Sequence, residues 1–158
     1  MQVTFITVGN LKEKYLIEAV AEYQKRLSIY ARVELVELKE VKIANENNST
    51  EIANALKEEG AKIIERIPDG AYVVSLCVEG KSIDSISLAK LVGKVQDSSG
   101  KICFIIGSSY GLSDTVKARS DYKLSLSALT FPHQLARVML YESVYRSFTI
   151  LNGKKYHK

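Results

Sequence analysis

The chain has 158 residues, a net charge of +4 from 22 basic and 18 acidic residues, and an apolar fraction of 46%. These totals indicate one globular domain, residues 1–158, that is long enough to bury a core. No apolar run approaches the length of a membrane span and the N-terminus lacks a basic secretion signal, so we expect a cytoplasmic protein without a membrane partner.

The basic excess is concentrated at the C-terminus. No acidic residue follows Glu142, whereas Arg146, Lys154, Lys155 and Lys158 do, and these four charges equal the whole net charge. A basic end of this kind indicates a polyanionic partner. A solvated tail explains the charge alone equally well.

The cysteines and histidines give no sign of a metal site. Cys77 and Cys103 lie in apolar runs without CxxC spacing, which predicts buried free thiols in a reducing compartment. The histidines are His133 and His157, and neither belongs to a His/Cys/Asp cluster at ligand spacing. We therefore expect no metal cofactor.

The first third of the chain alternates strand and helix. Residues 2–8 predict a buried strand that ends at Gly9, and apolar residues at helical spacing predict a helix over about 11–27. Residues 32–38 alternate between apolar and polar side chains, as an edge strand does. The polar, Asn-rich residues 39–50 predict a loop.

The next segments repeat this alternation. Ser49 or Thr50 is expected to cap a second helix, which Gly60 would weaken at its centre by about 1 kcal/mol relative to Ala. Residues 71–78 then form a strongly apolar run that predicts a third strand. We expect Gly80 to end that strand.

The remaining strands complete an α/β pattern. Asp84 or Ser85 is expected to cap a third helix. Residues 102–106 are apolar on both faces, as in a central parallel strand covered by helices on both sides. A short helix over 114–119 and a strand over 122–126 follow. The alternation predicts a single-domain α/β fold with a mainly parallel sheet flanked by helices.

The last helix is expected to run from Pro132 to about Leu151. Pro is favoured at the first helical position, so Thr130 or Phe131 would be the cap. Its predicted apolar stripe is Leu135, Val138, Met139, Tyr141, Val144, Tyr145, Phe148 and Leu151. Packing explains the aromatic residues Tyr141, Tyr145 and Phe148 better than base stacking does, and a dimer face is the alternative.

Three loops follow predicted strand ends, after Leu76, Ile106 and Leu126. Ligands of open α/β sheets bind at this edge, so the loops predict a pocket whose backbone groups bind an adenine-like base and its ribose. The Gly-Ser-Ser-Tyr-Gly-Leu run at 107–112 is neither GxGxxG nor a P-loop, and taken alone a plain tight turn explains it better than a ligand site does. His133, at the start of the last helix, is either catalytic or structural.

Several stretches resemble the RlmH family, SPOUT-class methyltransferases of bacterial large-subunit ribosomal RNA. The resemblance runs from end to end. The two most specific motifs are Thr-Phe-Pro-His-Gln at 130–134 and Tyr-His-Lys at 156–158. The other matching positions are Val8, Gly9, Leu11, Lys12, Tyr23, Arg26, Leu27, Ile106, Gly107, Gly111, Leu112, Leu124, Ser125, Arg137, Val138, Tyr145 and Arg146.

The resemblance implies a SPOUT fold with a C-terminal trefoil knot, in which residues 122–134 pass through the loop around 103–112. It implies a homodimer built on the first and last helices. It also implies methylation of N3 of a pseudouridine in a stem-loop of 23S ribosomal RNA on assembled ribosomes. The methyl donor would be S-adenosyl-L-methionine, bound by Leu76, Gly107, Leu126, Ser127, Ala128, Leu129, Thr130 and Phe131.

The same resemblance assigns the remaining site residues. Tyr156, His157 and Lys158 would fold over the pocket of the partner subunit, and His157 is preferred to His133 as the group that removes the N3 proton. The residues expected to hold RNA phosphates are Arg137, Arg146, Lys154 and Lys155.

Two departures and two alternatives accompany this assignment. The loop 126–130, Leu-Ser-Ala-Leu-Thr, varies among relatives, and we expect this to be tolerated because backbone contacts would do the binding. Many relatives have Gly-Gly where this chain has Gly107 and Ser108, so Ser108 would be strained if that position needs a positive φ. The alternatives are a catalytically silent ribosome-binding module of the same fold and an enzyme that uses a different nucleotide cofactor. The intact Pro132-His133 junction and the C-terminal motif disfavour the first, and the missing GxGxxG disfavours the second.

Overall fold

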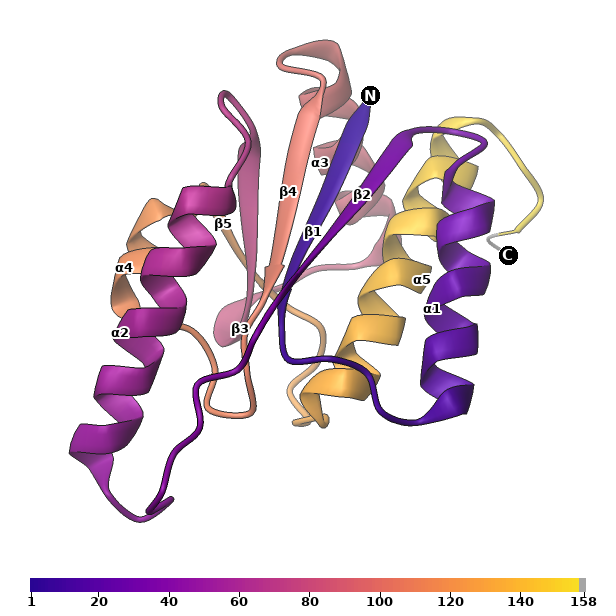
Figure 1. The fold of residues 1–158 in the computed structure, drawn as a ribbon. Helices are drawn as coiled ribbons and strands as arrows, with labels where there is room; N and C mark the ends of the chain where they lie inside the picture. Colours follow the sequence, from indigo (N-terminus) through magenta and orange to yellow (C-terminus); the bar gives the residue numbers. More distant parts are fainter. Residues whose placement is uncertain (157–158) are drawn as a thin grey trace.

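The computed structural model describes residues 1–156 as a five-stranded parallel sheet between two layers of helices (Figure 1). The strands are β1 (Gln2–Val8), β2 (Arg32–Leu38), β3 (Tyr72–Ser82), β4 (Lys101–Ile106) and β5 (Tyr122–Ser125). The helices are α1 (Lys14–Leu27), α2 (Ser49–Arg66), α3 (Ser85–Asp97), α4 (Asp114–Arg119) and α5 (His133–Leu151).

The strand order is β2-β1-β4-β3-β5, and every neighbouring pair is parallel. The predicted mainly parallel sheet, the central position of β4 and the edge position of β2 are therefore confirmed. Helices α1, α3 and α5 cover one face of the sheet and α2 and α4 the other (Figure 1). The carboxyl ends of the strands meet at one edge, the lower edge in Figure 1.

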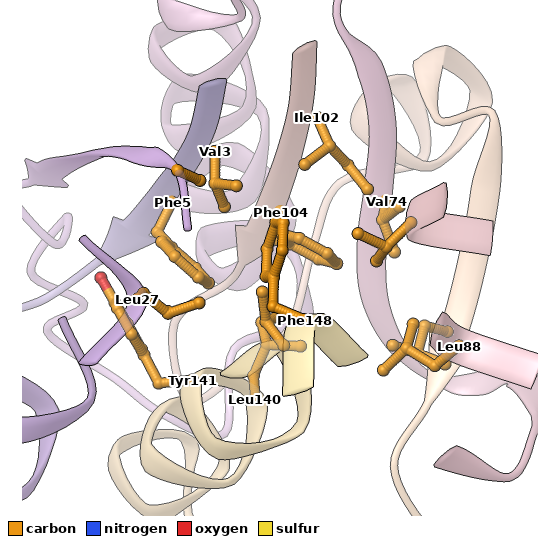
Figure 2. Packing of buried hydrophobic residues seen from close by; sticks show 14 of the residues in the cluster. Val3, Phe5, Leu27, Val74, Leu88, Ile102, Phe104, Leu140, Tyr141 and Phe148 are labelled. Atoms are coloured by element: carbon orange, nitrogen blue, oxygen red, sulfur yellow. The ribbon is translucent and has the colours of Figure 1, made fainter. Parts of the chain in front are cut away.

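The main core lies between the sheet and the α1, α3 and α5 layer (Figure 2). Phe5 and Phe104 project from neighbouring strands with ring centroids 5.5 Å apart, and Phe5 also stacks on Tyr141 of α5 at 3.8 Å. Successive strand residues point to opposite faces, so Ile6 and Ile105 fill a second, smaller core under α2 and α4. The sheet is thus buried on both faces.

Helix α5 packs against both α1 and α3, and this changes its buried face. The predicted stripe is right for Tyr141, Val144 and Phe148 but wrong at its ends, because Leu135 and Leu151 are exposed. Leu140, outside the stripe, is fully buried. A helix with neighbours on two sides has no single apolar stripe, so its periodicity does not identify the buried positions.

Two predicted helix caps are corrected by the structure. Asn48, rather than Ser49 or Thr50, caps α2, and its side-chain oxygen accepts hydrogen bonds from the N–H groups of Thr50 and Glu51. At α5 the residue before the helix is Pro132, which supplies no side-chain acceptor. The first N–H groups of α5 therefore lack a side-chain cap. Asp84 caps α3, as expected.

The sequence predicted that the third strand ends at Gly80, but strand β3 continues past Gly80 to Ser82. Its pairing with β5 is interrupted after Leu76 and resumes at Lys81, so residues 77–80 form a bulge. A β-carbon on Gly80 would lie 2.7 Å from the carbonyl carbon of Leu124. Glycine is needed here because the β5 backbone passes directly against it.

The predicted free thiols are confirmed. Cys77 and Cys103 are both buried and unpaired, and burial raises the pKa of Cys103 to about 12. Among residues 1–156, no helix combines the length and apolar character that crossing a bilayer requires.

We predict that Gly80→Ala lowers the free energy of unfolding by about 1–3 kcal/mol, because the added methyl group overlaps the β5 backbone. Val78→Ala is the matched control: Val78 lies in the same bulge but is exposed, so its change should stay within about 0.5 kcal/mol. Urea unfolding at one protein concentration measures both. Equal stability of the two variants would contradict the close approach of β3 and β5.

Candidate functional site

A cavity of about 500 Å³ opens at the carboxyl ends of β3, β4 and β5. Three segments enclose it: the β3 bulge, the turn after β4, and the loop between β5 and α5. Its lining residues are Leu76, Cys77, Val78, Glu79, Ile106, Gly107, Ser108, Ser109, Tyr110, Gly111, Leu112, Lys117, Ser125, Leu126, Ser127, Leu129, Thr130, Phe131, Pro132, His133 and Ala136. The volume is within the usual range for a nucleotide-sized ligand.

All of the predicted cofactor residues except Ala128 line this cavity. Leu76 contributes from β3, Gly107 from the turn after β4, and residues 126–131 from the loop before α5. The sequence therefore identified the three segments that the fold brings together. Whether they bind S-adenosyl-L-methionine stays a prediction.

The turn after β4 is tight and depends on Gly107. A β-carbon on Gly107 would lie 2.0 Å from the carbonyl oxygen of Gly111, so no other residue fits. The Gly111 N–H donates to the Ser108 carbonyl at 3.0 Å, and Gly111 has φ +91°. The tight turn expected at 107–112 is also a cavity wall.

Ser108 is not strained, because its φ is not positive. It is buried, and its hydroxyl donates a 2.9 Å hydrogen bond to the Glu59 carboxylate of α2. The other Glu59 oxygen accepts the Val41 N–H at 2.9 Å. Burial raises the pKa of Glu59, although both hydrogen bonds favour its charged form. Ser108 thus ties the cavity turn to α2 and, through Glu59, to residues 39–48.

An ion pair that the sequence analysis missed lies in the cavity wall. Lys117 Nζ of α4 is 2.5 Å from Glu79 Oε1 of the β3 bulge. Hydrogen bonding to Lys117 lowers the pKa of the Glu79 carboxyl, so the pair is fully charged at neutral pH. No sequence spacing signals the pair, because the bulge and the packing of α4 create it.

His133 lines the cavity at the first position of α5. Its ring is half-buried, and desolvation lowers its pKa below the ordinary value of 6.5, although Glu40 opposes this shift. The imidazole is therefore neutral at pH 7 and able to accept a proton. It is the only histidine that the described residues include.

Arg137 is not available to RNA, which corrects one prediction. Its side chain is 1% exposed, with Nη1 2.9 Å from Glu37 Oε1 and Nη2 donating to the Gly9 carbonyl at 2.6 Å. The guanidinium therefore binds the ends of β1 and β2. From sequence alone a buried arginine looks the same as an exposed one.

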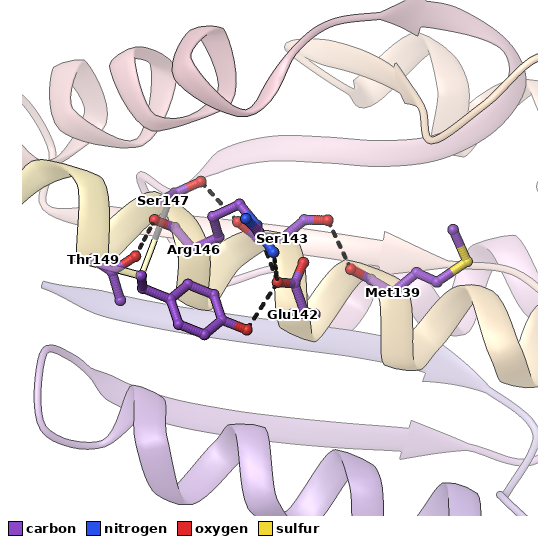
Figure 3. Close-up of polar contacts among 7 residues, drawn as sticks. Met139, Glu142, Ser143, Arg146, Ser147 and Thr149 are labelled. Carbon is purple, nitrogen blue, oxygen red and sulfur yellow. Dashed lines mark hydrogen bonds and ion pairs between the residues drawn. The ribbon is translucent and has the colours of Figure 1, made fainter. Parts of the chain in front are cut away.

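Residues 152–156 follow the end of α5 that is opposite the cavity (Figure 1). Arg146 pairs with Glu142 at 2.6 Å, and Glu142 also accepts the Tyr156 hydroxyl at 3.1 Å (Figure 3). The Arg146 guanidinium stacks on the Tyr156 ring at 4.9 Å. Lys154 and Lys155 are exposed beyond the end of α5.

His157 and Lys158, which carry two of the predicted catalytic roles, lie outside the described residues. Their roles, and the action of the tail on a partner's cavity, stay predictions. In the part of the chain that the structure covers, no three His, Cys, Asp or Glu side chains are close enough to hold a metal ion.

Comparisons with known proteins agree on one family. A family model described as "Predicted SPOUT methyltransferase" matches residues 1–157. Proteins named "Ribosomal RNA large subunit methyltransferase H" from Bacillus pumilus and Clostridium kluyveri are 44% and 46% identical, with 100% of each chain covered. A crystal structure of a probable methyltransferase from Bordetella pertussis superimposes with a TM-score of 0.56 at 14% identity, covering 92% of this chain and 93% of that chain, which shows a shared fold.

We predict that Ser108→Ala lowers the free energy of unfolding by about 1–3 kcal/mol at pH 8, because the buried Glu59 carboxylate loses a donor. Ser109→Ala, at the exposed neighbour, is the control and should change it by less than about 0.5 kcal/mol. Losing that donor raises the pKa of Glu59 further. The difference in free energy of unfolding between wild type and Ser108→Ala should therefore shrink as the pH falls and Glu59 becomes protonated in both proteins. If this difference does not change with pH, the hydrogen bond from Ser108 to a charged Glu59 carboxylate is contradicted.

Proposed function

This chain belongs to the SPOUT methyltransferases, within the family of ribosomal RNA large subunit methyltransferase H, and we propose that it methylates large-subunit ribosomal RNA. The observation that carries the proposal is the cavity at the carboxyl ends of β3, β4 and β5, which gathers the cofactor residues expected for this family. The methyl donor is S-adenosyl-L-methionine. The acceptor is N3 of a pseudouridine in a 23S stem-loop, modified on assembled ribosomes.

The cavity residues suit this donor. Apolar side chains such as Leu76, Ile106 and Leu112 would pack against the adenine, and the loop backbone would bind its polar edge. The donor also ends in an amino acid that carries one positive and one negative charge. Lys117 and Glu79 are the complementary charges in the wall, and they would hold those ends. When bound, the donor supplies an electrophilic methyl group, so the protein's task is positioning.

Proton removal from the acceptor nitrogen needs a base. We retain His157 as first choice, acting from the partner subunit's C-terminal tail, with Tyr156 and Lys158 beside it. His133 is the second choice, supported by its neutral imidazole in the cavity wall. Tyr156 is hydrogen-bonded to Glu142 of its own α5, so it would have to give up this bond to act beside His157.

The remaining features belong to the same proposal. The protein acts as a cytoplasmic homodimer built on α1 and α5, and residues 122–134 are threaded to form a trefoil knot. Lys154 and Lys155 reach RNA from the end of α5, where both side chains are exposed. A silent ribosome-binding module would not require the charged, enclosed cavity, so we favour the enzyme.

Calorimetric titration with S-adenosyl-L-methionine tests the cofactor assignment. Wild-type protein should bind, and Lys117→Met should weaken binding about ten-fold or more, because a hydrogen bond to a charged group is lost. Lys90→Met, on the exposed face of α3, should bind like wild type. If wild-type protein does not bind S-adenosyl-L-methionine, the methyltransferase proposal is wrong. If all three proteins bind it equally, only the role of Lys117 in cofactor binding is wrong.

Removing residues 157–158 tests the catalytic tail. Because Tyr156 remains to pack on α5, the shortened protein should fold and bind S-adenosyl-L-methionine normally. It should transfer methyl groups to ribosomes at less than about 1% of the wild-type rate, the loss expected when general base catalysis is removed. Normal transfer by the shortened protein would move the base role to His133, and His133→Asn would then be the inactive variant.

A further inference from the structure

A second hollow, of about 820 Å³, adjoins the cofactor cavity at the same edge of the sheet. It lies between the segment after β1 and the segment after β2, which both emerge at the lower edge of the molecule in Figure 1. We call it the basic groove, and its lining residues are Gly9, Asn10, Lys12, Glu37, Lys39, Glu40, Val41, Lys42, Ile43, Glu46, Ser109 and Tyr110. None of its lysines was assigned a role above.

The three lysines of the groove are available for a ligand. Lys12, Lys39 and Lys42 are all exposed, and none makes an ion pair with another residue within 1–156. Three ammonium groups around one hollow, none of them held in an ion pair, are able to contact a polyanion. RNA phosphates are the anions that the proposed substrate would bring.

The carboxylates of the groove already have partners. Glu37 is paired with the buried Arg137 at 2.9 Å. Glu40 is half-buried and accepts the Ser109 hydroxyl at 3.5 Å, and Glu46 lies near the Tyr110 hydroxyl. Arg137 thus neutralises Glu37, and hydroxyl groups of the protein approach Glu40 and Glu46, whereas the three ammonium groups make no ion pair among residues 1–156. The groove is therefore suited to an anion despite its mixed composition.

The groove and the cofactor cavity share a wall. Ser109 and Tyr110 line both hollows. His133 belongs to the cofactor cavity, and its Nε2 would lie 3.8 Å from a β-carbon on Gly9, which lines the groove. A nucleotide that entered through the groove would therefore meet the cofactor cavity beside His133.

We infer that the basic groove binds the RNA on either side of the acceptor nucleotide, with Lys12, Lys39 and Lys42 holding its phosphates. This inference rests on the proposed function and adds a substrate site on the same chain as the cofactor. Lys154 and Lys155 cannot fill this role in their own subunit, because α5 (His133–Leu151) separates them from the cavity by about 27 Å. The groove instead lies next to the reaction.

The test is methyl transfer to 70S ribosomes isolated from cells that lack this gene, with Lys12, Lys39 and Lys42 all changed to Ala. Three lost phosphate contacts should raise the KM for ribosomes roughly 100-fold at about 0.1 M salt. They should also reduce the slope of log affinity against log salt by about 2. The kcat and the affinity for S-adenosyl-L-methionine should not change, because none of these lysines lines the cofactor cavity.

The control removes the same number of charges elsewhere, with Lys57, Lys90 and Lys94 changed to Ala. These exposed lysines of α2 and α3 lie outside both hollows, so KM and salt slope should stay as in wild type. An unchanged KM in the groove variant would overturn the inference, as would an equal loss in the control. A weaker dimer with unchanged RNA affinity would assign the groove to a second copy instead.

Failure of the proposed function has a different signature. Wild-type protein would then transfer no methyl group to the ribosomes. Co-sedimentation with ribosomes would in that case test whether the basic groove binds RNA. A loss of binding in the groove variant alone would support the inference. Equal binding by wild type, the groove variant and the control variant would overturn it.

Discussion

The arrangement of both hollows depends on the buried guanidinium of Arg137. It binds Glu37 at the end of β2 and the Gly9 carbonyl at the end of β1, while its own helix begins in the wall of the cofactor cavity. One side chain therefore sets how α5, β1 and β2 meet at the functional edge. A buried charge that loses its partner costs about 3–5 kcal/mol, so the three elements are held in one geometry rather than a range.

Much of the fold was predictable because strands and helices in this chain have clear patterns. Residues 102–106 are apolar at every position, and this pattern correctly predicted that they form the central strand of the sheet. The errors have physical causes. Helix α5 has two helical neighbours, so the predicted apolar stripe was wrong about the buried residues at the two ends of the helix. Gly80 was predicted to end its strand because the sequence does not reveal the close approach of β5. Local patterns carry little information about contacts between distant segments.

The site was predictable in part for the same reason. Gly107 and residues 126–131 were predicted from loop positions and family motifs, and all of them except Ala128 do line one cavity. Arg137 was misassigned because charge does not reveal burial. The pairs Glu59–Ser108 and Glu79–Lys117 were missed because 49 and 38 positions separate their partners, and only the packing of α2, α4 and the β3 bulge unites them.

The end of α5 has an optical consequence. The chain contains no tryptophan and nine tyrosines, so tyrosine dominates its near-ultraviolet emission. Tyr145 contacts Tyr23, Tyr30 and Tyr156 with ring centroids 5.0–6.3 Å apart, and Tyr156 is the last described residue before the tail. Displacement of Tyr156 would separate its ring from Tyr145 and free its hydroxyl from the Glu142 carboxylate. The protein thus carries an intrinsic fluorophore that would report the release of Tyr156 from α5.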